Sequence, residues 1–343
     1  MCRASALLLA ATVAVVALGG CAVSLDDEAP DTSAAPDAPL LASCPVAASG
    51  AVAGATGRVQ AVSLPDGSVL AVLGAVQHGS GSPTEAASVV HLATANTLGA
   101  CGEGLAAADD AGGGVDVTAL DSDAAGTALG VWVEPGEGAV HAFVSVARGF
   151  DVLGTGLATL DRATGRFIAG AGYLFAGDGR PSYGDAALVA GGYVYAYGCA
   201  ASGFLAEDCF VARAPVADAG DRTAWRYFRD GGDFGADPDD AWPLFSGGSG
   251  LAVAQVGPRV VVAHATPLGD TVLLRTGLGP TGPWSPAAPT TRCEVPAGAF
   301  CGALAFVAPL ADAGELALTY AVASFEPLDA AARRTRLVRL SAP

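Results

Sequence analysis

"LAVAQVGPRVVVAHA", residues 251–265, consists of two apolar runs on either side of a short turn that contains Gly257 and Pro258. This composition is typical of a β-hairpin, because β-branched residues favour strands while glycine and proline favour turns. The same order of apolar run, Gly/Pro/Asp turn and apolar run recurs at residues 59–76, 128–146, 186–198 and 303–323. Successive turns lie roughly 55–70 residues apart, which is close to the period of a repeat of four short strands with their loops.

A third strand is predicted after each hairpin, because a further run follows in which leucine or β-branched residues alternate with polar ones. The candidate third strands are residues 88–94, 155–161, 209–215, 271–277 and 334–341. Outer fourth strands are expected within residues 165–175 and 223–231. The clearest helical candidate, residues 327–336, is short.

Five such repeats predict an all-β fold, namely a five-bladed β-propeller with about four antiparallel strands per blade. We expect a single propeller domain over residues 44–343. A propeller has to close its ring, and the predicted closing strand of the last blade lies in "AASGAVAGATG", residues 47–57. A bent β-sandwich and a six-bladed ring are the alternative folds.

The first 20 residues are predicted to be a lipoprotein signal peptide. Arg3 precedes the apolar run 6–18, which is shorter than the ~20 residues that span a bilayer. The run ends in "LGGC", which resembles a bacterial lipobox, so Cys21 is the predicted lipid attachment site. The alternative is an ordinary signal peptide with a chance cysteine. Residues 21–43 follow as a disordered Ala/Pro/Asp tether. We therefore expect an exported protein, held by its lipid anchor at the cell surface or the periplasmic face of a membrane.

The charge of the chain excludes some partners. The net charge is −17, and the basic residues are all arginines. Such an acidic chain argues against the binding of nucleic acids and of polyanionic substrates.

Cysteine usage predicts disulfides. Beyond Cys21 the chain has six cysteines, and an even number in an exported chain suggests disulfide bonds, although fifteen pairings are formally possible. Close spacing favours two local bonds and leaves one long-range pair. The predicted pairs are Cys44–Cys101, Cys199–Cys209 and Cys293–Cys301. There is no C-x-x-C and no Cys/His cluster with zinc spacing, so we predict no metal or other cofactor.

Three segments stand in a characteristic order: "GGYVYAYGC" (191–199), "FVARAPVADAGDRTAWRYF" (210–228) and "VLLRTGLGPTGPWSP" (272–286). Together they resemble segments of five-bladed propeller proteins of the glycosidase-like group. That group includes arabinanases and β-xylosidases, and a secreted branch with a known endo-D-arabinanase activity. The resemblance covers residues 58–340 and is most specific over residues 191–286. It implies a propeller that acts on or binds glycans.

Two departures from that group bear on catalysis. In the branch the first hairpin ends in "FGD", whose aspartate points into the central funnel, whereas here Gly74 is followed by Ala75. A later strand of the branch carries "HP" after an aromatic residue, whereas here Ala308 precedes the proline. The resemblance therefore implies degenerate catalytic residues, unless loops supply other acids.

The candidate catalytic acids are Asp185, Asp121 and Asp240. Asp185 directly precedes the first strand of the third repeat, where a carboxylate faces the funnel; the alternative is an aspartate that caps a turn. Asp121 belongs to a "DSD" triplet that also suggests calcium, but the distal glutamate of a calcium loop is missing. Asp240 lies in the acidic stretch 233–242, for which a solvated loop or a calcium loop is the alternative.

The candidate ligand-binding residues are His78, Tyr183 and Trp242. His78 follows the first hairpin and either lines the funnel or is a polar loop residue. Tyr183 lies two residues before Asp185, and Trp242 follows a run of acids and either stacks on a sugar or packs between blades. Trp284, in a Gly/Pro-rich turn, is expected to pack over a bend or between blades.

Three functions remain open at this point. The leading interpretation is a monomeric, surface-anchored lipoprotein that binds a glycan or another envelope polymer without catalysis. The second is an active glycoside hydrolase of the arabinanase type, and the third is a scaffold for an envelope protein. The sequence contains no G-x-S-x-G, H-E-x-x-H, phosphate-loop or dinucleotide motif.

Overall fold

Strands are the main regular elements of this chain. A computed structural model describes residues 40–45, 52–55, 58–73, 76–78, 89–94, 114–149, 151–177, 181–248, 250–307, 314–325, 328 and 335–342. All of them lie in one unit, Ala35–Pro343. The 3₁₀ helices of these residues are η2 (Val216–Asp218), η3 (Arg222–Ala224) and η4 (Pro238–Asp240). Within the described ranges no helix is long and apolar enough to cross a membrane.

The described strands form five sheets of three or more strands and one two-stranded ribbon. Sheet 1 contains β3 (Val59–Ser63), β4 (Ser68–Leu73) and β6 (Val89–Thr94). Sheet 2 contains β7 (Val115–Asp116), β8 (Ala125–Val133), β9 (Val140–Arg148), β10 (Asp151–Asp161), β11 (Arg166–Ala169) and β12 (Phe175–Ala176). Sheet 3 contains β13 (Ala186–Ala190), β14 (Tyr193–Gly203), β15 (Ala206–Pro215), β16 (Arg226–Phe228), β17 (Phe234–Gly235) and β18 (Phe245–Gly247).

Two further sheets and the ribbon complete the described strands. Sheet 4 contains β19 (Leu251–Val256), β20 (Arg259–Ala265), β21 (Thr271–Gly277) and β22 (Ala288–Arg292). Sheet 5 contains β23 (Ala299–Phe306), β24 (Glu315–Ser324), β25 (Arg336–Ser341) and β1 (Leu40–Pro45). The ribbon pairs β2 (Val52–Ala55) with β5 (Val76–His78).

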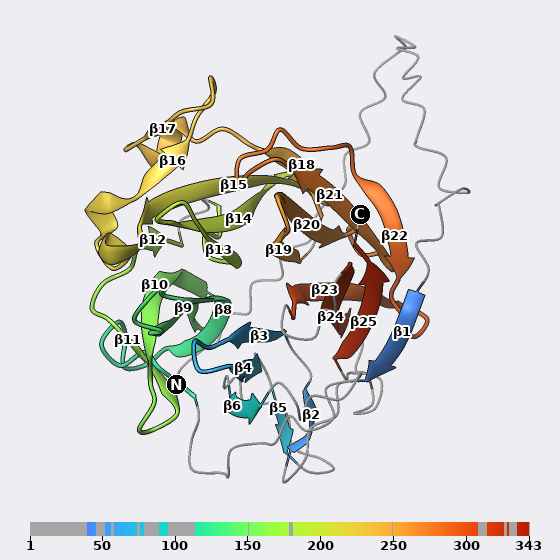
Figure 1. Ribbon diagram of the computed structural model, residues 1–343, viewed down its shortest axis with the longest axis horizontal. Coiled ribbons are helices and arrows are strands. Elements are labelled where there is room, and N and C mark those ends of the chain that lie inside the picture. Colours follow the sequence, from blue (N-terminus) through green and yellow to red (C-terminus); the bar gives the residue numbers. More distant parts are fainter. Residues whose placement is uncertain are drawn as a thin grey trace, which may run out of the picture. The chain divides into compact units, whose positions relative to one another are not determined.

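The first hairpin strand of each sheet lies innermost, and these strands contact one another in a closed cycle. β3 contacts β8, β8 contacts β13, β13 contacts β19, β19 contacts β23, and β23 contacts β3. Figure 1 shows the sheets fanning outward from this centre. The architecture is therefore all-β and propeller-like, as the repeats predicted.

Hydrophobic clusters between successive sheets hold this arrangement together. On β20, Val260 and Val262 belong to a cluster shared with sheet 3, while Val261 and Ala263 belong to one shared with sheet 5. This follows from the two-residue period of a strand, which turns alternate side chains to opposite faces. Because both faces of the sheet are covered, the strand reads as an uninterrupted apolar run. That explains why the quoted hairpin is so rich in valine.

The predicted hairpins are confirmed. They are β3–β4, β8–β9, β13–β14, β19–β20 and β23–β24, and their third strands are β6, β10, β15, β21 and β25. The outer strands expected within residues 165–175 and 223–231 are β11 and β16. Most of the helical candidate 327–336 lies outside the described residues.

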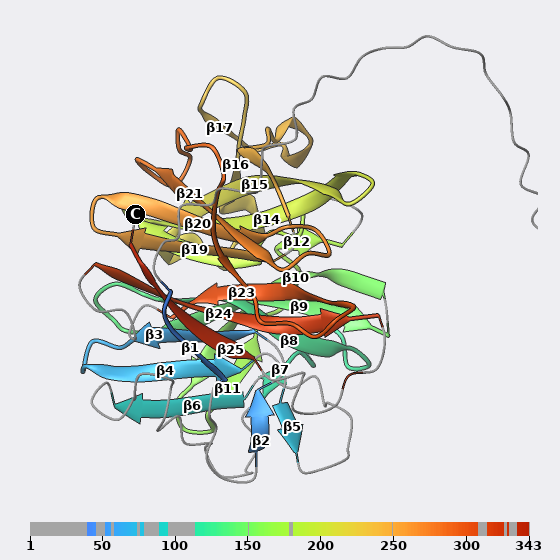
Figure 2. The same ribbon diagram turned by 90° about the vertical axis from the view of Figure 1, so that its right-hand side faces the viewer.

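The predicted closing strand was placed wrongly. The strand that pairs with β25 is β1 (Figure 2), which precedes the expected stretch. Cys44 of β1 stands opposite Leu337 of β25. Within the expected stretch 47–57, only β2 is a described strand, and it pairs with β5 instead. The run "LLASCP" begins with two leucines, whereas "VAGA" is a short, Gly/Ala-rich strand. Glycine and alanine are depleted in strands, so the run with two leucines is the better strand former of the two.

Trp284 packs between sheets, as expected. A β-bridge joins it to Gly277 at the end of β21, and a Cβ atom on that glycine would lie 2.8 Å from the indole ring. The indole also meets the Phe245 ring of β18 edge-on, with centroids 5.7 Å apart. The Gly/Pro-rich turn thus fastens sheet 4 to sheet 3.

Two of the predicted disulfides are present. Cys199 and Cys209 stand directly opposite each other on β14 and β15, and Cys293 is bonded to Cys301. Cys101 lies outside the described residues, so the bond between Cys44 and Cys101 stays a prediction.

Removal of the β14–β15 disulfide is expected to destabilise the protein. The bond closes a loop with a sequence separation of 10, for which the loss of loop-closure entropy in the unfolded chain corresponds to roughly 2–3 kcal/mol. A Cys199→Ala/Cys209→Ala double variant should lose about that much free energy of unfolding in urea titrations. An unchanged urea midpoint would show that the hairpin register alone holds this pair together.

Candidate functional site

An axial cavity of about 250 Å³ lies inside the ring of innermost strands. Alanine, valine and leucine side chains of these strands form most of its wall. Its polar residues are Arg58, Gln60, Asp185 and Gln255. Within the described lining, Asp185 is the one carboxylate and Arg58 the one cation.

Arg58 reaches across the ring. It immediately precedes β3, yet its Nη1 donates to the carbonyl oxygen of Asp185 in front of β13, and its Nη2 lies 3.5 Å from the carbonyl oxygen of Leu251 on β19. Sheets 3 and 4 are the two that do not adjoin sheet 1 in the cycle of contacts. The guanidinium therefore crosses the axis. Burial lowers the pKa of Arg58, and the charge of Asp185 opposes that shift.

Asp185 titrates close to neutral pH. Burial raises the pKa of this carboxyl from 3.8 to about 6; the Arg58 charge lowers it, and repulsion from Glu207 adds to the rise. The net shift shows that loss of hydration outweighs the nearby cation. A carboxyl with such a pKa exchanges protons readily near neutral pH, which is a property of general acids and bases.

Glu207 is a second acid near this site that the sequence did not reveal. It is half-buried on β15, opposite Ala201 of β14 and Gly247 of β18. Burial raises the pKa of its carboxyl. In the sequence, the orientation of Glu207 is indicated only by its two-residue spacing from Cys209, because residues two apart lie on the same face of a strand.

Polar contacts between sheets fix the wall of the cavity. The Gln60 amide donates to the carbonyl of Leu129 and accepts from the backbone N–H of Val131 at 3.1 Å, which ties β3 to β8. Thr319 of sheet 5 donates to the carbonyl of Val59 at 2.6 Å. These bonds use backbone groups that adjacent sheets would otherwise leave unpaired, so the site rests on a rigid scaffold.

The other predicted acids do not join Asp185. Asp121 pairs with Arg148 at the surface of sheet 2. Asp240 is exposed in η4, which contacts β16 among the outer strands of sheet 3. Figure 1 shows β16 and β17 at the outer margin, away from the ring of innermost strands. Of the three candidates, only Asp185 lines the axial cavity.

The predicted ligand-binding residues also lie apart. Tyr183 is 2% exposed, and its ring packs against those of Phe175 and Tyr227 in the core between sheets 2 and 3. Trp242 is 51% exposed, but its backbone N–H bonds to Phe228 of the outer strand β16. His78 ends β5, which pairs with β2 outside the five sheets, and its side chain is not among those described.

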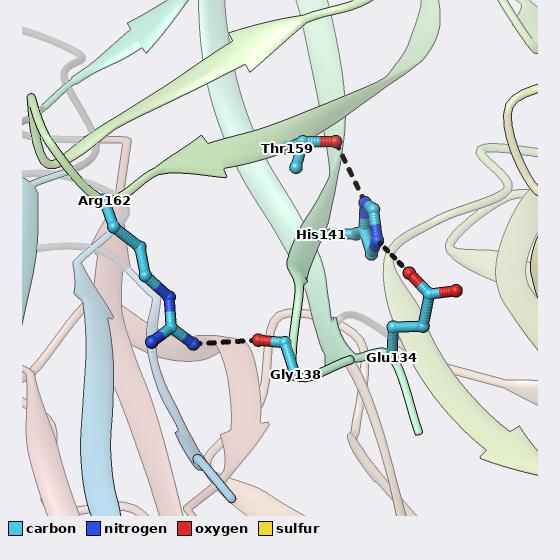
Figure 3. Close-up of polar contacts among 5 residues, drawn as sticks. All are labelled: Glu134, Gly138, His141, Thr159 and Arg162. Atoms are coloured by element: carbon cyan, nitrogen blue, oxygen red, sulfur yellow. Dashed lines mark hydrogen bonds and ion pairs between the residues drawn. The ribbon is translucent and has the colours of Figure 1, made fainter. Parts of the chain in front are cut away.

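A separate polar cluster lies at the β8–β9 turn. Figure 3 shows the His141 ring between Glu134 and Thr159; Nε2 lies 3.4 Å from a carboxylate oxygen of Glu134, and Nδ1 lies 3.0 Å from the Thr159 hydroxyl. The Trp132 ring stacks on the imidazole at 4.3 Å. Trp132, His141 and Thr159 are cross-strand neighbours on β8, β9 and β10. The cluster is thus a row of cross-strand contacts that stabilises sheet 2.

No group of three or more His, Cys, Asp or Glu side chains suited to a metal ion occurs among the described residues. The "DSD" triplet illustrates this: the Asp121 carboxylate accepts from the backbone N–H of Asp123 and pairs with Arg148. Its oxygens are thus engaged in a turn and an ion pair.

Comparison with solved structures gives the same architecture. A GH43_1 enzyme from Xanthomonas citri complexed with xylotriose superimposes with a TM-score of 0.55 at 16% identity, covering 88% of this chain and 90% of that one. The chain has the fold of the GH43 hydrolases. RS223-β-xylosidase superimposes equally well, with a TM-score of 0.55 at 13% identity over 84% of this chain and 92% of that one. No protein-family model and no curated protein sequence matches the chain.

The GH43 likeness confirms the resemblance seen in the sequence at the level of fold. At 13–16% identity, the likeness in fold does not show which side chains this chain shares with the GH43 enzymes. The chemistry therefore has to be argued from the cavity itself, which holds one carboxylate and one guanidinium in its described lining.

Proposed function

We propose that this protein binds a neutral glycan at the axis of its GH43-like fold without hydrolysing it. The observation that carries the proposal is that the lone carboxylate of the described lining, Asp185, lies near the Arg58 guanidinium, whose charge lowers the pKa of that carboxyl and which donates to the backbone carbonyl of Asp185. In this proposal the five sheets are the blades of a closed five-bladed propeller with about four strands each. An exported chain held by a lipid on Cys21 would present this site outside the cytoplasm.

The charge arrangement argues against hydrolysis. Cleavage of a glycosidic bond uses two carboxyl groups roughly 5–10 Å apart, one as acid and one as base or nucleophile. Here the group that faces Asp185 across the axis is a cation that two backbone carbonyls hold in place. A guanidinium cannot act as the base or the nucleophile, since it stays protonated and accepts no hydrogen bonds.

The lining suits a neutral sugar. Gln60 and Gln255 offer amide groups, Asp185 accepts hydrogen bonds from hydroxyls, and the aliphatic wall matches the C–H faces of a sugar ring. The paired charges of Arg58 and Asp185 leave little net attraction for an anion. The xylotriose complex of the Xanthomonas citri enzyme, which shares the fold, supports a pentose-based glycan.

A hydrolase is the second candidate, and one observation favours it. The pKa of Asp185 is raised to about 6, partly by Glu207, whose own pKa burial raises. Carboxyl groups with raised pKa values that lie near one another are typical of acid–base catalysis. In that case Asp185 would be the acid and Glu207 its partner, in place of Asp121 or Asp240.

Binding and hydrolysis should be measured together. We expect calorimetry to show binding of xylotriose or arabinotriose, and a reducing-sugar assay to show no cleavage. Asp185→Asn should weaken binding about tenfold or more, because a hydrogen bond to a charged group contributes roughly 1.5–3 kcal/mol. The matched control is Asp240→Asn, an exposed acid outside the cavity, which should bind like the wild type.

The alternative outcomes are distinct. Sugar release that disappears in Asp185→Asn would establish the hydrolase instead. Failure of every pentose oligosaccharide to bind would overturn the glycan proposal and leave a scaffold for an envelope protein as the remaining function.

A further inference from the structure

The β14–β15 hairpin ends in two large apolar residues that are open to solvent. Gly203 pairs with Ala206, so Phe204 and Leu205 form a two-residue turn. Phe204 is 94% exposed, and every residue from 201 to 206 is exposed. The tip therefore lies beyond the core of sheet 3, and burial within the fold does not explain its apolar side chains.

The backbone of this tip is also unfavourable for its sequence. Leu205 has a φ of 60°, which lies in the left-handed region where the Cβ atom of most residues crowds the backbone. Two-residue hairpin turns usually place glycine or asparagine in such a position. The leucine therefore works against local stability, and residues held in this way are concentrated at functional surfaces.

The β20–β21 turn shows the same two features. Leu268 lies in this turn, is exposed and has a φ of 51°. Sheets 3 and 4 are neighbours in the cycle of contacts. Two adjacent sheets thus each carry an exposed, left-handed leucine at the turn between their second and third strands.

β18 connects the two turns. Gly247 of β18 stands opposite Glu207 of β15. A Cβ atom on the next residue, Gly248, would collide with the carbonyl oxygen of Ala265 at the end of β20. Figure 1 shows β18 beside β15 and β21, and Arg275 of β21 donates to the carbonyl oxygen of a β18 residue at 3.0 Å. The two turns are therefore close together at one end of sheets 3 and 4.

The charge around the two turns favours a protein surface over a membrane. The disulfide-closed segment 199–209 contains two acids, Glu207 and Asp208, and no basic residue. At the other turn, Asp270 pairs with the exposed Arg292 at 4.0 Å. Membrane surfaces are commonly negative and attract basic segments, so they suit an acidic tip poorly. An apolar pocket with basic side chains at its rim complements it.

We infer that Phe204, Leu205 and Leu268 form a docking patch for another protein, one that presents an apolar pocket with a basic rim. The disulfide between Cys199 and Cys209 holds the hairpin in shape before binding, which reduces the entropy lost on association. Aromatic side chains are enriched at protein interfaces, and an exposed phenylalanine at a braced tip fits that role. None of the three residues lines the axial cavity, so the docking patch is separate from the proposed glycan site.

Photo-cross-linking from the docking patch identifies the partner. The full chain is made in its own cells with benzoylphenylalanine in place of Phe204, of Leu268 or, as the control, of Leu278, which is 75% exposed just after β21. We expect the same discrete protein adduct from both patch positions and none from position 278. Adducts with lipid, adducts with a second copy of the chain, or no adduct from either patch position would each overturn the inference. Binding of the purified protein to vesicles of phosphatidylcholine and phosphatidylglycerol would likewise favour a membrane instead.

Affinity for the purified cross-linked protein completes the test. Calorimetry should show at least about tenfold weaker binding by Phe204→Ser and by Leu205→Asn than by the wild type, whereas Leu278→Ser should bind normally. Asparagine tolerates the left-handed conformation, so Leu205→Asn should keep the wild-type urea midpoint or exceed it. That result separates a lost contact from lost folding. Equal affinities of all variants would overturn docking through this patch.

Glycan binding is an independent readout of the same variants. Phe204→Ser and Leu205→Asn should bind xylotriose as the wild type does, because they leave the axial cavity intact. If no protein binds xylotriose, the proposed function fails, while the cross-linking and the affinity for the partner still decide the docking patch.

Discussion

Asp185→Asn is expected to stabilise the protein at pH 7 by about 2–3 kcal/mol. The pKa of Asp185 is raised from 3.8 to about 6 in the folded protein. A raised carboxyl pKa means that the folded state favours the protonated form. The associated stability is complete below pH 4 and is lost as the pH rises through 6. Asparagine resembles the protonated carboxyl and stays neutral at every pH. The Asn variant therefore does not lose this contribution to the free energy of unfolding as the pH rises.

The Asn variant keeps the main contact of the axial arginine. Arg58 donates to the backbone carbonyl of residue 185, which the substitution does not remove. Urea unfolding at pH 4 and pH 7 measures the effect: the two proteins should have nearly equal free energies of unfolding at pH 4 and differ at pH 7. Asp240→Asn, the exposed control, should change stability by less than about 0.5 kcal/mol. A destabilised Asn variant at pH 7 would mean that attraction between the Asp185 carboxylate and the Arg58 charge outweighs the desolvation of the carboxyl.

His264→Phe is expected to protect the protein against acid by about 3 kcal/mol. His264 is 2% exposed on β20, and both of its ring nitrogens are buried. Its ring stacks on Phe245 with centroids 6.2 Å apart. Burial, with a smaller contribution from Arg275, lowers its pKa from 6.5 to about 4. Stability is therefore complete above pH 6.5 and is lost as the pH falls toward 4.

Phenylalanine removes both the charge and the two buried ring nitrogens. The free energy of unfolding of the Phe variant, relative to that of the wild type, should therefore rise by about 3 kcal/mol from pH 6.5 to pH 4, the range in which the wild type loses the contribution of this histidine. His264→Leu separates charge from packing, because it should be less stable than the Phe variant by the same amount at pH 4 and at pH 6.5. If the pH profiles of both variants ran parallel to that of the wild type, the titration of His264 would not contribute to stability.

These two groups act in opposite directions over the same pH range. Asp185 destabilises the fold as the pH rises from 4 to 6, while His264 stabilises it. The wild-type profile should therefore be flatter than that of either variant: Asp185→Asn should gain stability with rising pH, and His264→Phe should lose it. Hydrogen bonds lower the pKa of exposed aspartates such as Asp66 and Asp161, so these titrate below pH 4, outside this range.

The five hairpins were predictable because strand pairs and their turns are local in sequence. Each is encoded by apolar runs and a Gly/Pro/Asp turn, and every one is present. The closing strand is not local, because β1 meets β25 from the other end of the domain. Two short segments, 40–45 and 52–55, were both candidates for the closing strand. The residue pattern of neither segment determines the strand with which it pairs. Long-range pairing of this kind is set by the assembled ring.

The site was predictable only where position along a repeat determines which way a side chain faces. Asp185 precedes an innermost strand, and that location alone brought it to the axis. Arg58 occupies the matching place before β3, but its reach across the ring to β13 and β19 appears only in three dimensions. Glu207 comes near Asp185 through the long β14–β15 hairpin, whose projection the sequence does not specify.

The pairing of β1 with β25 also imposes an order in time. During synthesis the chain makes β1 before any of the five hairpins and β25 after all of them. Until residues 336–341 have been synthesised, β25 cannot pair with β1, and the edges of β1 stay open to other strands. The hydrogen bond from Thr319 to the carbonyl of Val59, which spans 260 residues, likewise forms only after Thr319 has been synthesised. Ring closure therefore comes late, after the local hairpins have formed, and a chain truncated before Arg336 cannot complete the sheet that contains its own first strand.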